Sequence, residues 1–494
     1  MNASIRRLSV VVLLMFLALM GSSTWVQFFS ADELNDDSRN LRTLYREFGT
    51  FRGPIVVDGE AVASSVPVDD EYDYQRVYAD GDLYAPVTGF YSIVYGRSGI
   101  ESAENRLLNG SSDSLFWTRF GDLLAGREQQ GAAVELTIRS AIQETAAASL
   151  GDQAGAVIAL DPRTGEILAM VSSPSYDPAL LANHDRGQVI TDYRTLEADD
   201  SRPLDNRAIG GNTYPPGSVF KLVVTAAALE AGYDPETLLR APQEMELPLT
   251  VETLENYGRG TCAEDDVISL ADALRISCNT AFGDVALGLG WGPIARKAEE
   301  FGWNDSSLRI PLTVAPSRLP EDPDEPQSVY SAIGQFDVRA TPLQVAMVGS
   351  AIANGGVLME PYLVAEVRNS DLAVVEIAEP TVYSTPLTHG DADLITEMMV
   401  AVVEDGTGKA ARIDGVSVAG KTGTAETGTD EPPHAWFVAF APAENPVVVV
   451  AVVVENGGDL GQDATGGRVA APIARDVLAA ALVVEAERVS GGTP

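Results

Sequence analysis

The chain contains little lysine and little histidine for its 494 residues. Four lysines occur, at positions 221, 297, 409 and 421, and arginine supplies most of the positive charge. Because lysine can lose its proton at accessible pH and arginine cannot, each lysine is a candidate for chemistry that arginine does not perform. The three histidines form no cluster with cysteine, and no G-x-S-x-G motif gives a serine a plausible partner. Neither a zinc site nor a Ser-His-Asp triad is therefore expected, and no metal or other cofactor is predicted.

Basic charge of the kind that binds nucleic acid is also missing. The formal net charge is −38, and so acidic a protein repels phosphate backbones. The simplest interpretation is an acidic surface that favours solubility. Hydrophobic residues make up 45 % and charged residues 21 % of the chain, as in ordinary folded proteins. A chain of this length exceeds one ordinary core, so two or more domains are expected.

Only two cysteines are present, Cys262 and Cys278, 16 positions apart. In an exported protein they can form a disulfide, which would contribute roughly 3 kcal/mol in the chain-entropy model. Two separate thiols are an equally weighted alternative. Thiol labelling with and without reductant distinguishes the two.

Long apolar runs are confined to the N-terminus. Arg6 and Arg7 precede an uncharged run at 8–31 that is long enough for one spanning helix. Positive charge before the run favours a cytoplasmic N-terminus, so residues 1–31 are predicted to anchor an extracytoplasmic protein in the cytoplasmic membrane. The alternative is a cleaved signal peptide, because the small residues 21–23 follow the apolar core.

After the N-terminal apolar run, the pattern of apolar and polar residues changes near Gly151. Residues 32–150 alternate short β-type runs with polar turns and are predicted to form a mixed N-terminal domain. Residues 151–494 read as one α+β domain, with strands at both ends and helices between them. The expected strands lie at 156–160, 167–171, 435–440 and 447–454, and the clearest expected helices at 219–231, 270–276 and 342–353.

A serine and a lysine stand three residues apart at the start of one predicted helix. Two prolines and Gly217 precede Ser218, and an apolar helical run follows through Lys221. The positive potential of a helix N-terminus favours a neutral lysine and stabilises an oxyanion, and a neutral amine within reach can activate the hydroxyl. Taken alone, Ser218 is more simply a helix N-cap.

Two further polar segments follow. Ser277-Cys278-Asn279 separates two apolar helical runs and can present a hydroxyl and a carboxamide, although taken alone it is more simply an ordinary turn. Lys421-Thr422-Gly423-Thr424 continues a strand-like alternation, and Gly423 would let a ligand approach the backbone. Lys421 can hold a carboxylate there, with hydrogen bonds from Thr422 and Thr424.

The last segment also fits a phosphate-loop pattern. Residues 415–422 match G-x-x-x-x-G-K-[ST]. A phosphate loop must lead into a helix, whereas residues 423–433 have no apolar helical period and end in two prolines. The nucleotide-binding interpretation is therefore disfavoured.

Taken together and in this order, S-x-x-K, S-x-N and K-T-G-T resemble the motifs of penicillin-binding proteins and serine β-lactamases. The resemblance covers about 130–485, and 52–55 resembles the family's N-terminal pedestal more loosely. The architecture is similar to class B, close to the actinobacterial penicillin-binding protein A type. The resemblance implies a transpeptidase domain with an antiparallel sheet flanked by helices, an all-helical subdomain, a pedestal or dimerisation-like domain at 32–150 and one transmembrane helix.

The resemblance also implies roles for the motif residues. Ser218 would attack the penultimate D-alanine of a peptidoglycan stem peptide, with Lys221 as the base, and β-lactams would acylate Ser218. Backbone N–H groups of Ser218 and Thr424 would form the oxyanion hole. Ser277 and Asn279 would relay the proton and orient the donor peptide. The terminal carboxylate would be bound by Lys421, Thr422, Gly423 and Thr424.

Expected partners are stem peptides, β-lactam antibiotics, a membrane glycan polymerase and division or elongation proteins, with no nucleic acid. The alternatives are a D,D-carboxypeptidase or β-lactamase on the same scaffold, or a non-catalytic scaffold or β-lactam sensor. No E-x-x-L-N pattern lies between the second and third motifs, which counts against a class A β-lactamase. The chain departs from the family at Phe336, where many relatives have glycine, and Cys278 occupies the variable centre of S-x-N.

Overall fold

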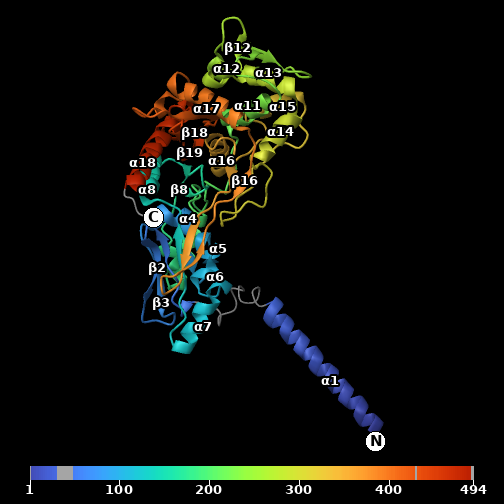
Figure 1. Ribbon diagram of the computed structural model, residues 1–494, viewed down its shortest axis with the longest axis vertical. Helices are drawn as coiled ribbons and strands as arrows, with labels where there is room; N and C mark the ends of the chain where they lie inside the picture. Colours follow the sequence, from blue (N-terminus) through green and yellow to red (C-terminus); the bar gives the residue numbers. More distant parts are fainter. Residues whose placement is uncertain (1, 31–47, 429–430, 491–494) are drawn as a thin grey trace.

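A computed structural model describes residues 2–30, 48–428 and 431–490 (Figure 1). A long helix, α1 (Asn2–Thr24), leaves the molecule at the lower end and continues as a π-helical turn to Phe29. A sheet-containing pedestal lies above it, and a larger domain of sheet and helices forms the top. Part of the predicted 32–150 domain, residues 32–47, falls outside the described residues.

The predicted N-terminal helix is present. Residues Ile5–Phe29 are 25 in number, have a mean hydropathy of 2.0 and are not buried against the rest of the protein. The helix is long and apolar enough to cross a membrane.

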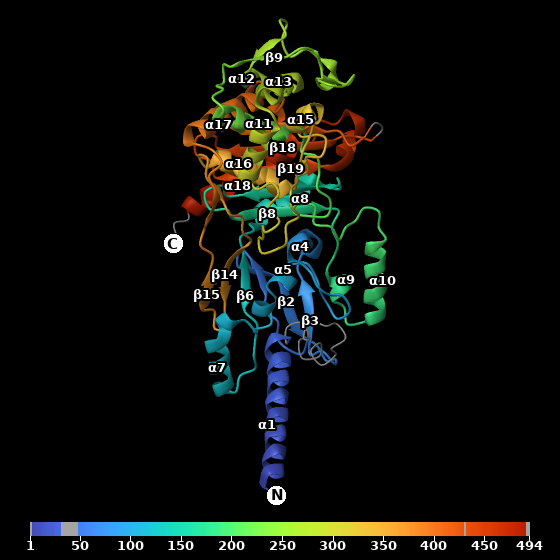
Figure 2. The same ribbon diagram turned by 90° about the vertical axis from the view of Figure 1, so that its right-hand side faces the viewer.

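The pedestal is built on one mixed sheet of six strands in the order β15-β14-β6-β1-β2-β3. Strand β1 runs parallel to β6, and the other neighbours are antiparallel. Three short helices pack on the sheet or on one another, and a fourth lies at the lower end of the pedestal (Figure 2). The elements are β1 (Ile55–Val57), β2 (Glu60–Pro67), β3 (Tyr74–Tyr78), β6 (Ala133–Leu136), β14 (Val364–Arg368), β15 (Val374–Ile377), α4 (Gly81–Thr88), α5 (Gly99–Ala103), α6 (Asn105–Leu108) and α7 (Phe116–Ala125).

Two strands of the pedestal sheet come from far along the chain. Strands β14 and β15 come from the middle of the upper domain's sequence, yet β14 pairs with β6 (Figure 2). Between these segments the chain crosses into the upper domain and returns. The pedestal is therefore completed by a hairpin inserted from the larger domain, a pairing that the local pattern at 364–377 does not reveal.

A buried ion cluster sits inside the pedestal. Glu101 is fully buried and accepts hydrogen bonds from Arg52 at 2.5 Å and from Arg76 at 2.6 Å. Arg52 also donates to Asn105, and Arg76 donates to the carbonyl of Gly53 at 2.9 Å. One carboxylate thus ties the start of β1, strand β3 and helix α5 together.

The upper domain contains a five-stranded antiparallel sheet in the order β17-β18-β19-β7-β8. Its first and last segments in sequence pair at β7 and β19, as the sequence pattern predicts. All strands except β17 are nearly continuous runs of buried apolar side chains, because helices cover both faces. The strands are β7 (Gly155–Leu160), β8 (Ile167–Ser173), β17 (Ala419–Ala425), β18 (His434–Ala441) and β19 (Val448–Val454).

Helices on the two faces form separate cores. Helices α8 (Ser140–Leu150) and α18 (Ala470–Ser490) cover one face, and α16 (Pro342–Ala353) covers the other. Helix α8, although it precedes residue 151, packs on β8 and α18 rather than in the pedestal.

A helical subdomain with small hairpins lies above the sheet in Figure 2. The predicted helix at 219–231 begins as a 3₁₀ turn (Gly217–Phe220) and becomes α-helical only at Lys221. The helices at 270–276 and 342–353 match the predicted ranges. The subdomain elements are α11 (Lys221–Glu230), α12 (Leu270–Ile276), α13 (Asn279–Leu289), α14 (Trp291–Glu300), α15 (Glu325–Ala332), α17 (His389–Glu404), β9 (Leu238–Arg240), β10 (Glu244–Glu246), β11 (Thr253–Glu255) and β12 (Val267–Ser269).

The remaining short elements connect these layers. They are β4 (Tyr91–Ser92), β5 (Gly96–Arg97), α9 (Ala179–Ala182), α10 (Arg186–Glu197), β13 (Leu358–Met359) and β16 (Val382–Ser384).

Candidate active site

The turn that carries Ser218 is held tightly from two sides. Gly217 has φ +55°, a conformation that glycine adopts without strain, and its N–H donates to the carbonyl of Gly334 at 2.9 Å. A Cβ at position 217 would lie 2.7 Å from the carbonyl oxygen of Thr424. The Ser218 turn therefore sits directly against β17, and only glycine fits before the serine.

Lys221 lies fully buried at the first turn of α11. Its Nζ donates to the carbonyl of Ser277 at 2.8 Å and to Oδ1 of Asn279 at 2.7 Å, with the Ser277 hydroxyl at 3.4 Å. Burial, and then the nearby charge of Lys421, hold the pKa of Lys221 well below its ordinary value. A neutral amine is thus favoured beside the S-x-N segment, one turn from Ser218.

Lys421 also contacts the hydroxyl of Ser277. Its Nζ donates to Ser277 Oγ at 2.8 Å and to the carbonyl of Thr422 at 2.9 Å. Burial lowers the pKa of Lys421 to about 7. Ser277 Oγ therefore lies between two lysine ammonium or amine groups, which suits a hydroxyl that passes a proton.

The S-x-N segment has an irregular backbone that other residues stabilise. Ser277 is the left-handed C-cap of α12, with φ +62°. Cys278 forms a disulfide with Cys262, with 5.9 Å between the Cα atoms. Asn256 accepts from the N–H groups of Asn279 and Thr280 at 2.9 and 3.1 Å. Sequence reasoning missed Asn256, because no local motif marks a residue that supports a turn some 20 positions away.

The K-T-G-T segment lies within β17, with β18 on one side. Gly423 opposes Trp436, where a Cβ would lie 2.8 Å from the Trp436 Cβ. Thr422 shares a hydrogen bond with Thr407 at 2.6 Å. The strand runs to Ala425, and the next element is β18 rather than a helix. This geometry excludes the phosphate-loop interpretation, as the sequence predicts.

The three segments meet in one cleft of about 1230 Å³. They come from positions some 60 and 140 residues apart, yet Ser218, Ser277 and Thr424 all line it. Lys221 and Lys421 lie buried beneath it and contact Ser277. Other residues that line the cleft are Asn279, Thr422, Tyr257, Tyr330, Ile333, Gln335 and Phe336.

Phe336 has an unusual backbone at the edge of this cleft. Its φ is +58°, and the left-handed region costs a residue with a side chain roughly 1–2 kcal/mol. The side chain is 40 % exposed. The carbonyl accepts from Arg339 Nη1 at 2.9 Å, which fixes the turn.

A second polar network supports the Ser218 turn from behind. Glu455 accepts from the Tyr214 hydroxyl at 2.6 Å and from the buried Arg207 at 3.1 Å. The Trp436 indole donates to the carbonyl of Pro215 at 3.1 Å. Burial and the Glu455 charge raise the pKa of Tyr214. The residues before Ser218 are thereby fixed to β18 and to the end of β19.

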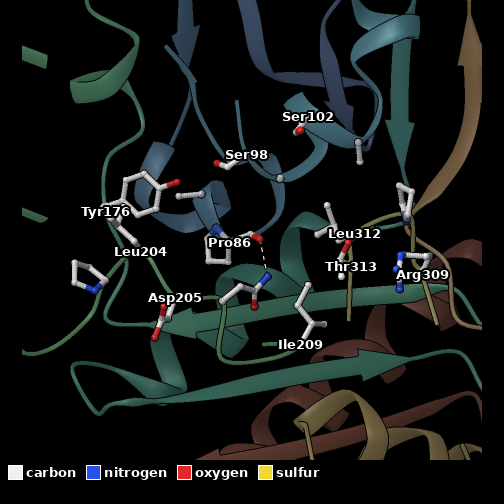
Figure 3. A pocket seen from close by; sticks show the side chains of 17 residues that line it. Pro86, Ser98, Ser102, Tyr176, Leu204, Asp205, Ile209, Arg309, Leu312 and Thr313 are labelled. Carbon is white, nitrogen blue, oxygen red and sulfur yellow. Dashed lines mark hydrogen bonds between the residues drawn. The ribbon is translucent and has the colours of Figure 1, made fainter. Parts of the chain in front are cut away.

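A separate cavity of about 410 Å³ lies between the pedestal and the upper domain (Figure 3). Pro86 and Ser98 border it from the pedestal, and Asp205, Ile209 and Arg309 border it from the upper domain. The Asn206 amide donates to the carbonyl of Pro86 at 2.7 Å across the boundary. None of the residues predicted from the motifs lines this cavity, so the candidate site is the upper cleft.

The fold and the cleft define the class of protein. Residues 155–479 match the family model of the penicillin binding protein transpeptidase domain, and residues 52–134 match the penicillin binding protein A dimerisation domain. The chain belongs to the family of penicillin-binding protein transpeptidases.

Similar proteins narrow the class further. The chain is 44 % identical over 490 residues to a peptidoglycan D,D-transpeptidase PbpA of Mycolicibacterium smegmatis, covering 98 % of this chain and 99 % of that protein. It is also similar to penicillin-binding protein A of Mycobacterium tuberculosis as a ceftriaxone acyl-enzyme complex, with a TM-score of 0.86, 43 % identity and coverage of 89 % and 100 %. The penicillin G acyl-enzyme complex of that protein gives a TM-score of 0.83 and 43 % identity, with coverage of 88 % and 100 %. Within the family the chain is of the class B, penicillin-binding protein A type.

Proposed function

We propose that this chain is a membrane-anchored peptidoglycan D,D-transpeptidase that forms an acyl-enzyme at Ser218. The observation that carries the proposal is the convergence of Lys221 and Lys421 on Ser277, in the cleft that Ser218 lines. Similar proteins are named D,D-transpeptidases and form acyl-enzymes with penicillin G and ceftriaxone.

Acylation begins at the Ser218 hydroxyl. Ser218 Oγ attacks the carbonyl carbon of the penultimate D-alanine, and Lys221, neutral because it is buried, takes the hydroxyl proton. Collapse of the tetrahedral intermediate breaks the peptide C–N bond. The proton passes through Ser277 to the departing D-alanine amine, and Asn279 orients the donor. The hydrogen bonds of Lys221 to both residues support this relay.

Strand β17 binds the terminal carboxylate and the neighbouring backbone of the donor peptide. Lys421, Thr422 and Thr424 bind the terminal carboxylate, and Gly423 lets the peptide approach the backbone. The backbone N–H groups of Ser218 and Thr424 form the oxyanion hole. The close approach of Gly217 to Thr424 supports this assignment, because it brings the two backbone segments together.

The second half-reaction transfers the acyl group to an amine of a neighbouring stem peptide. The amine nitrogen attacks the ester carbonyl and gives its proton to Lys221, the C–O bond to Ser218 breaks, and Lys221 returns the proton to Ser218 Oγ. β-Lactams acylate Ser218 in the same way, but their leaving amine stays tethered to the acyl group. The acyl-enzyme therefore persists.

Transfer to water is the competing function, which would make the chain a D,D-carboxypeptidase or β-lactamase. One assay distinguishes transpeptidation from hydrolysis. The purified protein is incubated with a donor peptide ending in D-Ala-D-Ala and an amine acceptor. The proposal predicts a cross-linked product by mass spectrometry and slow nitrocefin turnover. Free D-alanine without cross-linked product, or rapid nitrocefin turnover, contradicts it.

We further propose that α1 remains as the anchor, with the N-terminus cytoplasmic and the cleft outside. The apolar length of 5–29 and the basic pair Arg6 and Arg7 support this topology. A membrane glycan polymerase and division or elongation proteins are proposed as partners. Full-length protein that stays in the membrane fraction after a high-salt wash supports the anchor, and soluble protein starting near residue 24 contradicts it.

The acylation rate should have a bell-shaped pH profile. Lys221 must be neutral, and its lowered pKa keeps it so until the pH falls well below its ordinary pKa, so the acid limb reports its protonation. Lys421 must be charged to bind a carboxylate, and its pKa of about 7 places the alkaline limb near neutral pH. Second-order rate constants for a chromogenic β-lactam from pH 5 to 9 report these free-enzyme values.

The Lys421→Met variant provides the matched control for this profile. This variant should be acylated more slowly than the wild type at every pH. Its pH profile should lack the alkaline limb, because residue 421 no longer carries a group that deprotonates. An alkaline limb that survives the substitution would show that another group titrates.

A further inference from the structure

Phe336 is the only aromatic residue among the described residues whose φ is positive. Such a conformation is a genuine outlier for a bulky side chain, and it requires support from the surroundings. The support comes from the turn itself, in which Gly334 binds Gly217 and Arg339 binds the Phe336 carbonyl. The residue is thus held in strain next to the Ser218 turn.

Stability does not account for a phenylalanine at this position. The bonds that fix the turn are made by backbone atoms of Gly334, Gln335 and Phe336, and glycine would keep them all. Phe336 is 40 % exposed, so burial of the rest of the side chain contributes roughly 1–2 kcal/mol, which only offsets the cost of the left-handed backbone. A glycine at 336 would relieve the left-handed strain and retain the turn.

The ring instead lines the cleft that Ser218 lines. Ile276 and Ile333 line the same cleft, so Phe336 is one of several apolar residues that border the space beside Ser218. The acyl group that Ser218 receives must lie in this cleft, because Ser218, Ile333 and Phe336 all line it.

We propose that Phe336 is a specificity-determining residue whose ring packs against the apolar part of the acyl group that Ser218 receives. The inference rests on the proposed function of Ser218. It extends that function by naming the feature of the acyl donor that is selected: an apolar side chain on the residue or acylamino group next to the reactive carbonyl. The retained backbone strain is the cost of presenting this ring.

Two penicillins that differ only in the side chain test the proposal. One carries a phenylacetyl group and the other an acetyl group on the same nucleus. In full-length protein, Phe336→Gly should lower the second-order acylation rate for the phenylacetyl penicillin about tenfold and change that for the acetyl penicillin less than twofold. Phe336→Leu should restore most of the loss, and the melting temperature of Phe336→Gly should change little, because lost burial and relieved strain are of similar size.

Leu372→Gly is the matched control variant. Leu372 also has a positive φ, of +63°, but it is 71 % exposed at the turn between β14 and β15 in the pedestal. It should leave both rates unchanged. Equal losses for the two penicillins in Phe336→Gly would mean that the residue acts through the Ser218 turn, and no loss for either would mean that the ring touches neither. Both results overturn the inference, whereas a wild-type protein that neither penicillin acylates would instead refute the proposed function.

Discussion

Replacing Ser218 with alanine should abolish covalent labelling by fluorescent penicillin. The acyl bond is proposed to form at this hydroxyl, and loss of a catalytic nucleophile typically lowers turnover by about 10⁶-fold. Labelling should fall below detection in a gel assay, and peptide mapping of the wild type should locate the adduct at 218.

The fold should survive this substitution, because Ser218 is half-buried and its turn is held by the Gly217 backbone. Ser306→Ala, at an exposed serine far from the cleft in sequence, is the matched control and should label like the wild type. Lys221→Ala should cause a loss of similar size, and the double variant should be no worse than either, since the two act as one unit. Label retained by Ser218→Ala would refute the assignment of the nucleophile.

Replacing Glu101 with alanine should destabilise the pedestal by about 3–5 kcal/mol, because it leaves two buried arginines without their counter-charge. Arg52 and Arg76 are both at most 3 % exposed and both donate to Glu101. Hydrogen exchange of the β2–β3 amides, which lie in this sheet, should show the loss directly.

The exposed ion pair Arg127–Asp371 gives the control. Both side chains are more than half exposed, so Asp371→Ala should change stability by less than about 1 kcal/mol. Burial raises the pKa of Glu101, but the charges of Arg76 and Arg52 outweigh it and hold the pKa below the ordinary value. The cluster's contribution should therefore be lost only as the pH falls through that lowered pKa. Similar exchange rates in Glu101→Ala and Asp371→Ala would show that the cluster contributes little.

The sheet of the upper domain could be read from the sequence because its strands are buried apolar runs. The expected strands at 156–160 and 447–454 agree with β7 and β19 within a residue or two. Burial on both faces makes such a run distinctive regardless of its partners. The cleft was predictable for a different reason: the three motifs, each weak alone, resemble in this order the motif set of a known family.

Features that depend on distant partners were not predictable. Strand β14 is mostly half-buried, and nothing in its residues reveals that it pairs with β6 more than 220 positions earlier. The α-helix after Ser218 begins at Lys221 rather than at Val219, since the turn is shaped by contacts with Gly334 and Thr424. The left-handed backbone of Phe336 likewise comes from its turn rather than from residue preference.

The insertion of β14 and β15 into the pedestal sheet makes the two halves of the protein interdependent. A shortened protein starting at residue 151 would carry this hairpin without β6, and the exposed edge of β14 would offer free backbone groups to other chains. Conversely, a pedestal expressed as 48–136 would lack two of its six strands. The two lobes must therefore fold together, and neither can be exchanged between relatives as an independent module without carrying residues 364–377 with it.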